Sequence, residues 1–393
     1  MRVLIVRRKG VKVGEVVGTQ AQAQAVAAQA QPERRQKLAY LEVARVVCIF
    51  AVVVAHATDL AASRSGPTGL TVFLSTAIRF VVPAFFMISG YLIGAKHRDP
   101  AYRLDARRFW SSRALTLVLP FVVWNVIYFW MFTLAYGGSI RGPWALFNLL
   151  TGEMHLYFIF VLLQLLALYT LLERWFGPRL LAWCLALAAV SSVTFYAVSD
   201  YLLWTAGPDA HAFEWHWGKL CLAWAVFFVW GVWLGYRPQA MEWLRRHRWW
   251  VLLAAVVLFV PYWLEMRYQV AHLGALARDY FLASGLPYQF AGACALLGVL
   301  AGWEATWRRH AAGRAVVAWG ALMFGVYVAH MAVAHYLDPL WQRVWPSAPQ
   351  ICEIALLAGT AFFATLVLVW LAGSRYLWPV GLALFGGRTG RRR

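Results

Sequence analysis

An apolar stretch long enough to cross a membrane, Tyr40–Leu60, carries ionisable residues at helical spacing. Arg45 and His56 are eleven residues apart. On an α-helix this separation is about three turns plus 20° of rotation, so both side chains lie on one face, about 16 Å apart along the axis. Glu42 lies three residues before Arg45, and Asp59 lies three residues after His56, so both extend the same face. Because charge within hydrocarbon is costly, this polar stripe is expected to face a bundle interior or a watery cavity.

The stripe contains the side chains that proton transfer requires. Histidine suits general-base chemistry because its unperturbed pKa, about 6.5, lies near working pH. Asp59 would then orient His56 and fix its tautomer, as a carboxylate does in hydrolytic triads. The alternatives are structural. Glu42 and Arg45 would form a simple ion pair near the headgroups, His56 would be an interfacial histidine, and Asp59 would be a solvated loop residue.

Two further histidines are expected at a similar depth in the membrane. His155 begins the fourth apolar stretch and His330 lies within the ninth. In the topology derived below, both fall in the outer part of the membrane together with His56. The three are therefore candidates for one site in the outer leaflet. A lone histidine is more often structural, and similar depth alone does not establish proximity.

A basic loop leads into the third apolar stretch. It contains Lys96, Arg98, Arg103, Arg107, Arg108 and Arg113. Guanidinium groups match phosphate oxygens well, so this loop is a candidate site for a phosphorylated cofactor, with Arg113 the strongest candidate because it lies just inside the span. The alternative is the general excess of positive charge in cytoplasmic loops.

The elements that would position these residues are membrane-spanning helices. Hydrophobic residues make up 62% of the chain and charged residues 13%, whereas a soluble domain averages about one-quarter charged. Each span must satisfy its own backbone hydrogen bonds in lipid, so helices are the expected form. The predicted fold is an all-α polytopic membrane protein with about ten transmembrane helices. The predicted spans are Tyr40–Leu60, Val72–Gly94, Ala114–Tyr136, Leu156–Leu172, Leu180–Val198, Lys219–Tyr236, Trp249–Leu264, Ser284–Gly302, Val316–Leu337 and Ile351–Gly373.

The net charge of +19 indicates orientation rather than nucleic-acid binding. With a cytoplasmic N-terminus, ten spans return the C-terminus to the cytoplasm. The cytoplasmic segments then hold 28 of the 36 Lys and Arg residues, which is the bias that the positive-inside rule describes. The sequence therefore predicts that both termini are cytoplasmic, and the basic loops would also attract anionic membrane lipid.

Three regions are predicted. Residues 1–38 form a basic, low-complexity cytoplasmic tail that is expected to be disordered. Residues 39–373 form one ten-helix membrane domain, and residues 374–393 form a basic cytoplasmic tail. The first span is the expected insertion signal. The five cysteines are spread singly without a Cys-x-x-Cys pair, so neither a disulfide framework nor a metal site is expected.

Five segments, in this order, resemble motifs of the membrane acyltransferase family 3, the bacterial glycan O-acyltransferases and their relatives. The family's signature of Arg, ten residues and then His is similar to Arg45 and His56 within the segment LEVARVVCIFAVVVAHA. The other four segments are VPAFFMISGYLIG at 82–94, WSSRALTLVLPFVVW at 110–124, HLYF at 155–158 and YVAH at 327–330. Two features depart from the family pattern. Tyr157 stands where the family usually has Trp, and the arginines before the third span are spaced differently from the family's Arg-x-x-Arg.

The resemblance implies transfer of an acyl group, most often acetyl, from cytoplasmic acyl-CoA to a hydroxyl of a cell-surface or lipid-linked glycan at the outer face of the bacterial inner membrane. His56 would be the general base and Arg45 would hold the donor or balance charge. His330, His155 and Asp59 would assist, and Arg45, Arg107, Arg108 and Arg113 would bind the cofactor phosphates. A phosphopantetheine arm, as long as an extended chain of about five residues, spans much of the distance from Arg45 to His56.

The same features fit other classes. A transporter or flippase of a glycan precursor would also use intramembrane charge and broken helices, but would consume no thioester. A sensor that kept the fold and lost the chemistry is a further alternative. A covalent acyl-histidine and a direct transfer both remain open. The acceptor hydroxyl, the acyl chain and the oligomeric state are not given by the residues.

Overall fold

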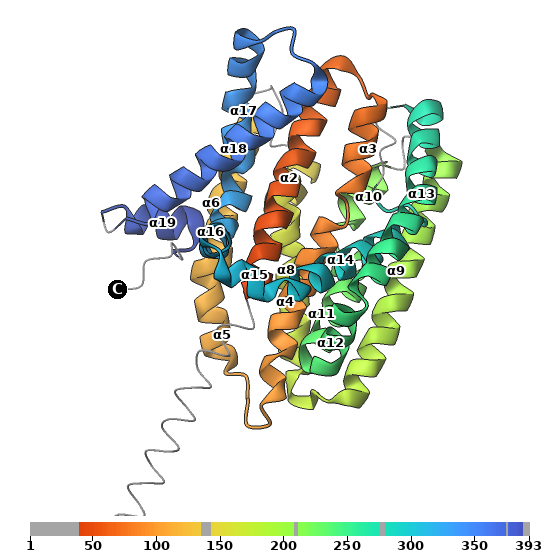
Figure 1. The fold of residues 1–393 in the computed structure, drawn as a ribbon, viewed down its shortest axis with the longest axis vertical. Helices are drawn as coiled ribbons and strands as arrows, with labels where there is room; N and C mark the ends of the chain where they lie inside the picture. Colours follow the sequence, from red (N-terminus) through yellow and green to blue (C-terminus); the bar gives the residue numbers. More distant parts are fainter. Residues whose placement is uncertain (1–38, 135–142, 208–210, 275–279, 375, 388–393) are drawn as a thin grey trace, which may run out of the picture.

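The computed structural model describes residues 39–134, 143–207, 211–274, 280–374 and 376–387. All regular structure in these residues is helical, and no strand occurs among them. The helices form one bundle, with α2 near its middle (Figure 1). The helices are α2 (Ala39–Ser65), α3 (Gly69–Ala77), α4 (Val81–Gly94), α5 (Ala106–Arg113), α6 (Leu119–Tyr128), α7 (Pro143–Thr151), α8 (Tyr157–Leu172), α9 (Pro178–Ala206), α10 (His211–Trp217), α11 (Ala225–Tyr236), α12 (Pro238–Arg246), α13 (Arg248–Leu273), α14 (Gly285–Gly302), α15 (Glu304–Arg309), α16 (Ala311–Trp319), α17 (Met323–Val344), α18 (Gln350–Ala372) and α19 (Trp378–Phe385).

The prediction of an all-α polytopic membrane protein is confirmed. Within the described residues, nine helical segments are long and apolar enough to cross a membrane. Each overlaps one predicted span. The remaining predicted span, Lys219–Tyr236, contains the apolar helix α11, which has only 12 residues. At a rise of about 1.5 Å per residue α11 is shorter than the hydrocarbon layer. It is preceded by buried non-α backbone, in which Trp224 is fully enclosed.

Helix α2 stands between the two large apolar clusters of the bundle. One face of α2 contributes Leu41, Ala44 and Cys48 to the cluster that is built mainly with α4, α8, α11 and α14. The other face contributes residues such as Ile49 and Val53 to the cluster built with α6, α17 and α18. Both of these faces are therefore covered by protein, and the buried part of α2 lies inside the bundle rather than against lipid.

Glycines allow α4 and α11 to approach until their backbones touch. A Cβ atom on Gly90 would lie 2.1 Å from the carbonyl oxygen of Phe228, and one on Gly231 would lie 2.1 Å from the carbonyl oxygen of Met87. Small residues at such crossings are the usual means of packing helices in membranes.

The second and third spans are not continuous α-helices. The second span breaks between α3 and α4, at Ile78–Phe80, where the backbone forms turns. The third contains two π-helical segments, Ala114–Val118 and Phe129–Leu134, on either side of α6. Interrupted backbone at membrane depth is tolerated where protein buries it or where it lines a cavity. The break at Ile78–Phe80 does line a cavity, as described below.

The region that the sequence predicts as a basic tail, 374–393, contains an apolar helix. Helix α19 packs against α6, and the indole Nε1 of Trp124 donates a hydrogen bond of 2.8 Å to the carbonyl of Leu384. Phe385 is buried in the cluster shared with α17 and α18. The predicted tail at 1–38 lies outside the described residues, as do Arg375 and the residues from 388 onward.

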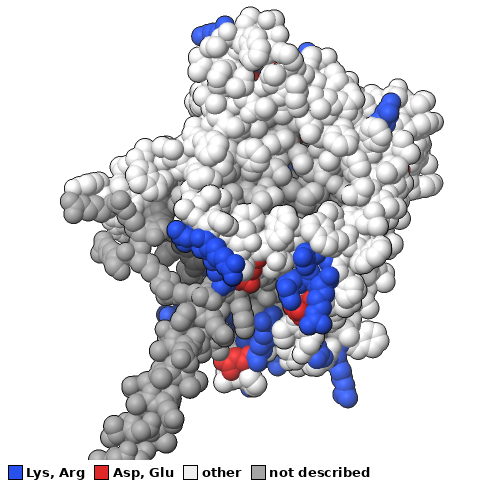
Figure 2. All heavy atoms as spheres, in the orientation of Figure 1, with Lys and Arg blue, Asp and Glu red and all other residues white. Residues whose placement is uncertain are grey.

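Positive charge gathers toward one end of the bundle. On the face drawn in Figure 2, Lys and Arg side chains cluster over the end where α5, α12 and α15 lie, and most of the remaining surface carries no charge. The arginines of this end include Arg107 and Arg108 on α5, Arg245 on α12 and Arg308 on α15. A basic end beside a long apolar body is typical of a membrane-spanning protein, because Lys and Arg are concentrated in the segments on one side of the membrane.

Candidate active site

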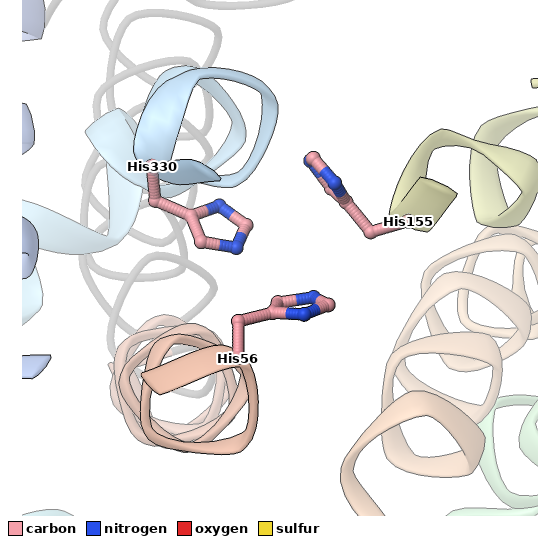
Figure 3. Close-up of side chains that lie close together, drawn as sticks. All are labelled: His56, His155 and His330. Carbon is pink, nitrogen blue, oxygen red and sulfur yellow. The ribbon is translucent and has the colours of Figure 1, made fainter. Parts of the chain in front are cut away.

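Three histidines from distant parts of the chain meet inside the bundle. His56 comes from α2, His155 from the 3₁₀ turn Met154–Leu156 before α8, and His330 from α17. The ring centroids are 5.5 Å apart for His56 and His155, 5.3 Å for His56 and His330, and 4.7 Å for His155 and His330. Figure 3 shows the three rings directed toward a common space. The structure therefore brings together the three residues that the sequence placed only at similar depth.

The position of His155 depends on a strained turn. Gly152 has φ of 110° and Met154 has φ of 48°, which is unusual for a residue with a side chain. Two side chains hold this turn. Asn125 on α6 accepts a 2.7 Å hydrogen bond from the backbone N–H of Glu153 and donates one to the carbonyl of Leu149.

The second side chain that holds the turn is Lys219. Its Nζ donates to the carbonyl of Gly152 at 3.0 Å and to Oδ1 of Asn148 at 2.8 Å, and its side chain is almost completely buried. The ammonium also lies over the ring of Trp215, 4.6 Å from the centroid. Lys219 therefore ties the turn that carries His155 to the segment before α11.

One carbonyl sets the tautomers of two histidines. Nε2 of His155 lies 3.0 Å and Nδ1 of His330 lies 2.7 Å from the carbonyl oxygen of Tyr327. A carbonyl oxygen only accepts, so both of these nitrogens carry the hydrogen. The other nitrogens, Nδ1 of His155 and Nε2 of His330, must then be lone-pair acceptors. Both are buried, and neither has a hydrogen-bond partner among the described residues. An unsatisfied buried acceptor costs about 1–3 kcal/mol.

A cavity of about 840 Å³ reaches the histidines. His56 and His155 form part of its wall, where His56 is half-buried and His155 is buried, while His330 is fully enclosed and does not line the cavity. Asp59 lines the same cavity one turn further along α2. The lining is otherwise mostly apolar and aromatic, and includes Val52, Leu60, Val82, Phe85, Met154, Tyr157, Phe158, Trp215, Phe281, Tyr327 and Met331.

Two cations that the sequence analysis did not select also line this cavity. Arg79 lies at the break of the second span, with its guanidinium over the ring of Tyr280, 5.2 Å from the centroid. Lys219 is the other. Both fall inside spans predicted from the sequence. An ionisable residue within a span is a functional-site candidate, and this is the signal in the sequence that indicates both residues.

Arg45 does not line the histidine cavity. Its guanidinium donates a 2.5 Å hydrogen bond to the carboxylate of Glu42, three residues before it on α2, and both side chains are roughly one-quarter exposed. The structural alternative weighed for these two residues, an i,i+3 ion pair, is therefore present. The predicted separation along the helix also holds, since Arg45 and His56 lie within the same continuous helix.

The three arginines predicted to bind cofactor phosphates lie together on the short helix α5, and none of them lines the histidine cavity. Arg107 and Arg108 are exposed. Arg113 is half-buried, with its guanidinium 3.4 Å from the ring centroid of Phe109 and hydrogen-bonded to that residue's carbonyl at 3.1 Å. Their proximity to one another fits a phosphate-binding surface, and their role stays a prediction.

Fold and site together define a polytopic membrane protein with a histidine-lined cavity inside its helical bundle. A family model described as an acyltransferase domain matches residues 38–374. The chain belongs to this family, the membrane acyltransferase family 3, as its sequence motifs predicted. It is an integral membrane protein of the acyltransferase class. No curated protein and no solved structure matches the chain at a significant level.

Proposed function

We propose that the protein transfers an acyl group, most often acetyl, from cytoplasmic acyl-CoA to a hydroxyl of a surface or lipid-linked glycan, with His56 as the general base. The observation that carries the proposal is the arrangement of the three histidines at the cavity wall. His56 and His155 both line the cavity, and His56 is the more exposed of the two; the buried acceptor nitrogens of His155 and His330 lie beside it.

The fixed tautomers explain how His56 would work. Neutral imidazole has one N–H and one lone pair. Because His155 and His330 present only lone pairs to the cluster, the N–H of His56 is favoured on the side that faces them. Its lone pair is then left for the cavity. One nitrogen from each ring lies within 4.8 Å of the others, and such catalytic contacts commonly shorten when substrate binds.

The reaction is balanced without a further reagent. The acceptor hydroxyl oxygen attacks the thioester carbonyl carbon as its proton passes to His56. The carbon–sulfur bond then breaks, and His56 returns the proton to the CoA thiolate. The imidazolium formed in between is stabilised by the lone pairs of His155 and His330. This is the part that a carboxylate plays in hydrolytic triads, and Asp59 on the same cavity wall adds a negative charge.

The donor is proposed to enter from the basic end. If that end is cytoplasmic, as the positive-inside rule favours, Arg107, Arg108 and Arg113 on α5 meet the CoA phosphates first. Arg45 lies between that end and His56 on the same helix. The pantetheine arm would extend along α2 toward the cavity, and the acceptor would enter the cavity from the opposite side.

The experiment compares purified wild type with His56→Ala, offering acetyl-CoA and either surface glycan or its lipid-linked precursor. His335→Ala is the matched control, because His335 lies on α17 five residues after His330 and does not belong to the three-histidine cluster. Wild type and control are expected to release CoA and label the glycan, and His56→Ala is expected to do neither.

Unchanged acylation by His56→Ala would remove His56 from the chemistry. If the wild type consumes neither acetyl-CoA nor longer acyl donors, the function moves to the rival class, a transporter of a glycan precursor. The two outcomes are distinguished by the wild type alone.

A further inference from the structure

The cluster of His56, His155 and His330 has the donor set of a transition-metal site. One nitrogen from each ring lies within 4.8 Å of the others. In a tetrahedral Zn²⁺ site with Zn–N bonds of about 2.0–2.1 Å, the ligand nitrogens of three imidazoles lie about 3.3 Å apart. A small rotation of the rings toward their shared space would bring the three nitrogens to this distance. Figure 3 shows that all three rings already face the shared space.

The surroundings of two rings match what metal-bound histidines require. A ligating histidine usually donates its other N–H to a carbonyl or carboxylate, which fixes its tautomer and orientation. The Tyr327 carbonyl accepts from both His155 and His330 in this way. Their remaining nitrogens, Nδ1 and Nε2 respectively, are buried acceptors without a partner among the described residues. A cation between them would satisfy both at once.

The third histidine would close the site from the cavity side. His330 is fully enclosed, and His155 lines the cavity but is buried, whereas His56 lines the cavity and is half-buried. His56 is therefore the ring with room to turn inward. Three protein ligands would leave a fourth coordination position open to the cavity for water or another small ligand, in contrast to the closed four-ligand sites of structural zinc.

We propose that His56, His155 and His330 bind a divalent transition-metal ion of the zinc class, and that the ion inhibits acyl transfer because the lone pair of His56 must then face the ion instead of the cavity. The ion site goes beyond the proposed function, and only its inhibitory consequence rests on that function. Among the described residues the cluster contains no carboxylate or thiolate. The ion's charge is therefore not neutralised by its ligands, and binding is reversible by chelation.

The test uses the full chain in detergent or nanodiscs, stripped with a chelator and then titrated with Co²⁺ and Zn²⁺. Metal content is measured after desalting, and bound Co²⁺ is followed by its visible d–d absorption. Wild type and the control His335→Ala are expected to bind one equivalent with a tetrahedral cobalt spectrum. His330→Ala and His155→Gln are expected to bind at least tenfold more weakly.

The wild type alone decides the site, so misfolding of a variant leaves the proposal falsifiable. If the wild type binds no metal, the histidine cluster is not a metal site and the proposal is overturned. Equal binding by wild type and both cluster variants, checked for monodispersity, places the ion elsewhere and also overturns it.

Inhibition is measured separately as loss of acetyl-CoA consumption on adding Zn²⁺, with recovery on adding chelator. If the ion binds but acetyl-CoA consumption does not change, the inhibitory effect is overturned and the metal site stands. A wild type that never consumes thioester contradicts the proposed function, and the metal titration still reports on the ion.

Discussion

His155 and His330 share a single hydrogen-bond acceptor, the carbonyl oxygen of Tyr327, although His155 and Tyr327 are 172 residues apart. The side chain of Tyr327 reinforces this link, because its hydroxyl donates to the backbone carbonyl of His155. One residue of α17 therefore sets the orientation of two rings and holds the turn from which one of them projects. The state of the histidine cluster depends on contact between α17 and that turn.

Tyr327→Phe removes the hydroxyl and keeps the ring. We expect destabilisation of about 1–3 kcal/mol, because the buried carbonyl of His155 loses its side-chain donor. The turnover number should also fall, since the His155 ring is no longer held. Thermal inactivation and acetyl-CoA consumption measure the two effects. Tyr336→Phe is the control, since Tyr336 on the same helix is 67% exposed. A Tyr327→Phe enzyme indistinguishable from this control would show that the hydroxyl does not position His155.

Asn125→Ala releases the turn that carries His155 from the other side. The substitution leaves two backbone groups, the N–H of Glu153 and the carbonyl of Leu149, without the amide that bonded them. We expect loss of activity together with a lower inactivation temperature, because each buried unsatisfied group costs about 1–3 kcal/mol. Gln239→Ala, which removes an exposed amide, should change neither quantity. Full activity of Asn125→Ala would mean that Lys219 alone holds the turn.

Arg45→Ala separates the two roles weighed for this residue. A partly exposed i,i+3 ion pair stabilises by about 1 kcal/mol or less, so the inactivation temperature should barely change. If Arg45 also holds the donor, KM for acetyl-CoA should rise at least about tenfold, the worth of one charge-assisted hydrogen bond. The matched control is Arg245→Ala, which breaks the Arg245–Glu242 pair of the same spacing on α12. Equal, small effects of both substitutions would leave Arg45 with a structural role only.

Gly90→Ala tests the backbone contact between α4 and α11. The added methyl would lie 2.1 Å from the carbonyl oxygen of Phe228, and a backbone atom cannot turn aside as a side chain can. We expect a loss of about 1–3 kcal/mol or more, seen as early aggregation on heating in detergent. Gly359→Ala on α18 is the control, because nothing lies within 4 Å of a Cβ there. Equal behaviour of the two variants would mean that α4 and α11 separate freely.

The orientation can be read with single cysteines in a cysteine-free background. Ser111 on α5 and Ser347 after α17 are both exposed. If the basic end is cytoplasmic, a membrane-impermeant maleimide should label Ser347→Cys in intact cells and Ser111→Cys only after permeabilisation. The reverse pattern would invert the predicted topology and with it the side from which acyl-CoA enters.

The sequence was sufficient to predict the class of fold, because a long apolar helix is a local property of its own residues. It also predicted that His56, His155 and His330 lie at one depth, since depth follows from position along each span. It could not predict that they touch. That contact depends on the left-handed backbone of Gly152 and Met154 and on the packing of α17 beside α2, neither of which has a periodic signal.

Two other features were beyond the sequence arguments for different reasons. Arg79 and Lys219 lie within predicted spans, but each is a single charge, without the helical stripe of polar residues that marks the first span. Helix α19 is too short to span a membrane, and its apolar residues stand between basic ones, so the net charge of the segment concealed it. Its place beside α6 is fixed by tertiary contacts such as that of Trp124 with Leu384.

The central place of α2 has a consequence for how the protein is made. Among the spans described, α2 is the first to leave the ribosome, yet the helices that enclose it include α14, α16, α17 and α18, which are synthesised last. Until these four helices have been synthesised, the α2 surface that they cover in the finished bundle lacks its permanent neighbours. The first helix to be inserted is therefore among the last to be buried, so biogenesis must tolerate a half-finished bundle with a polar stripe in contact with lipid or with an insertion factor.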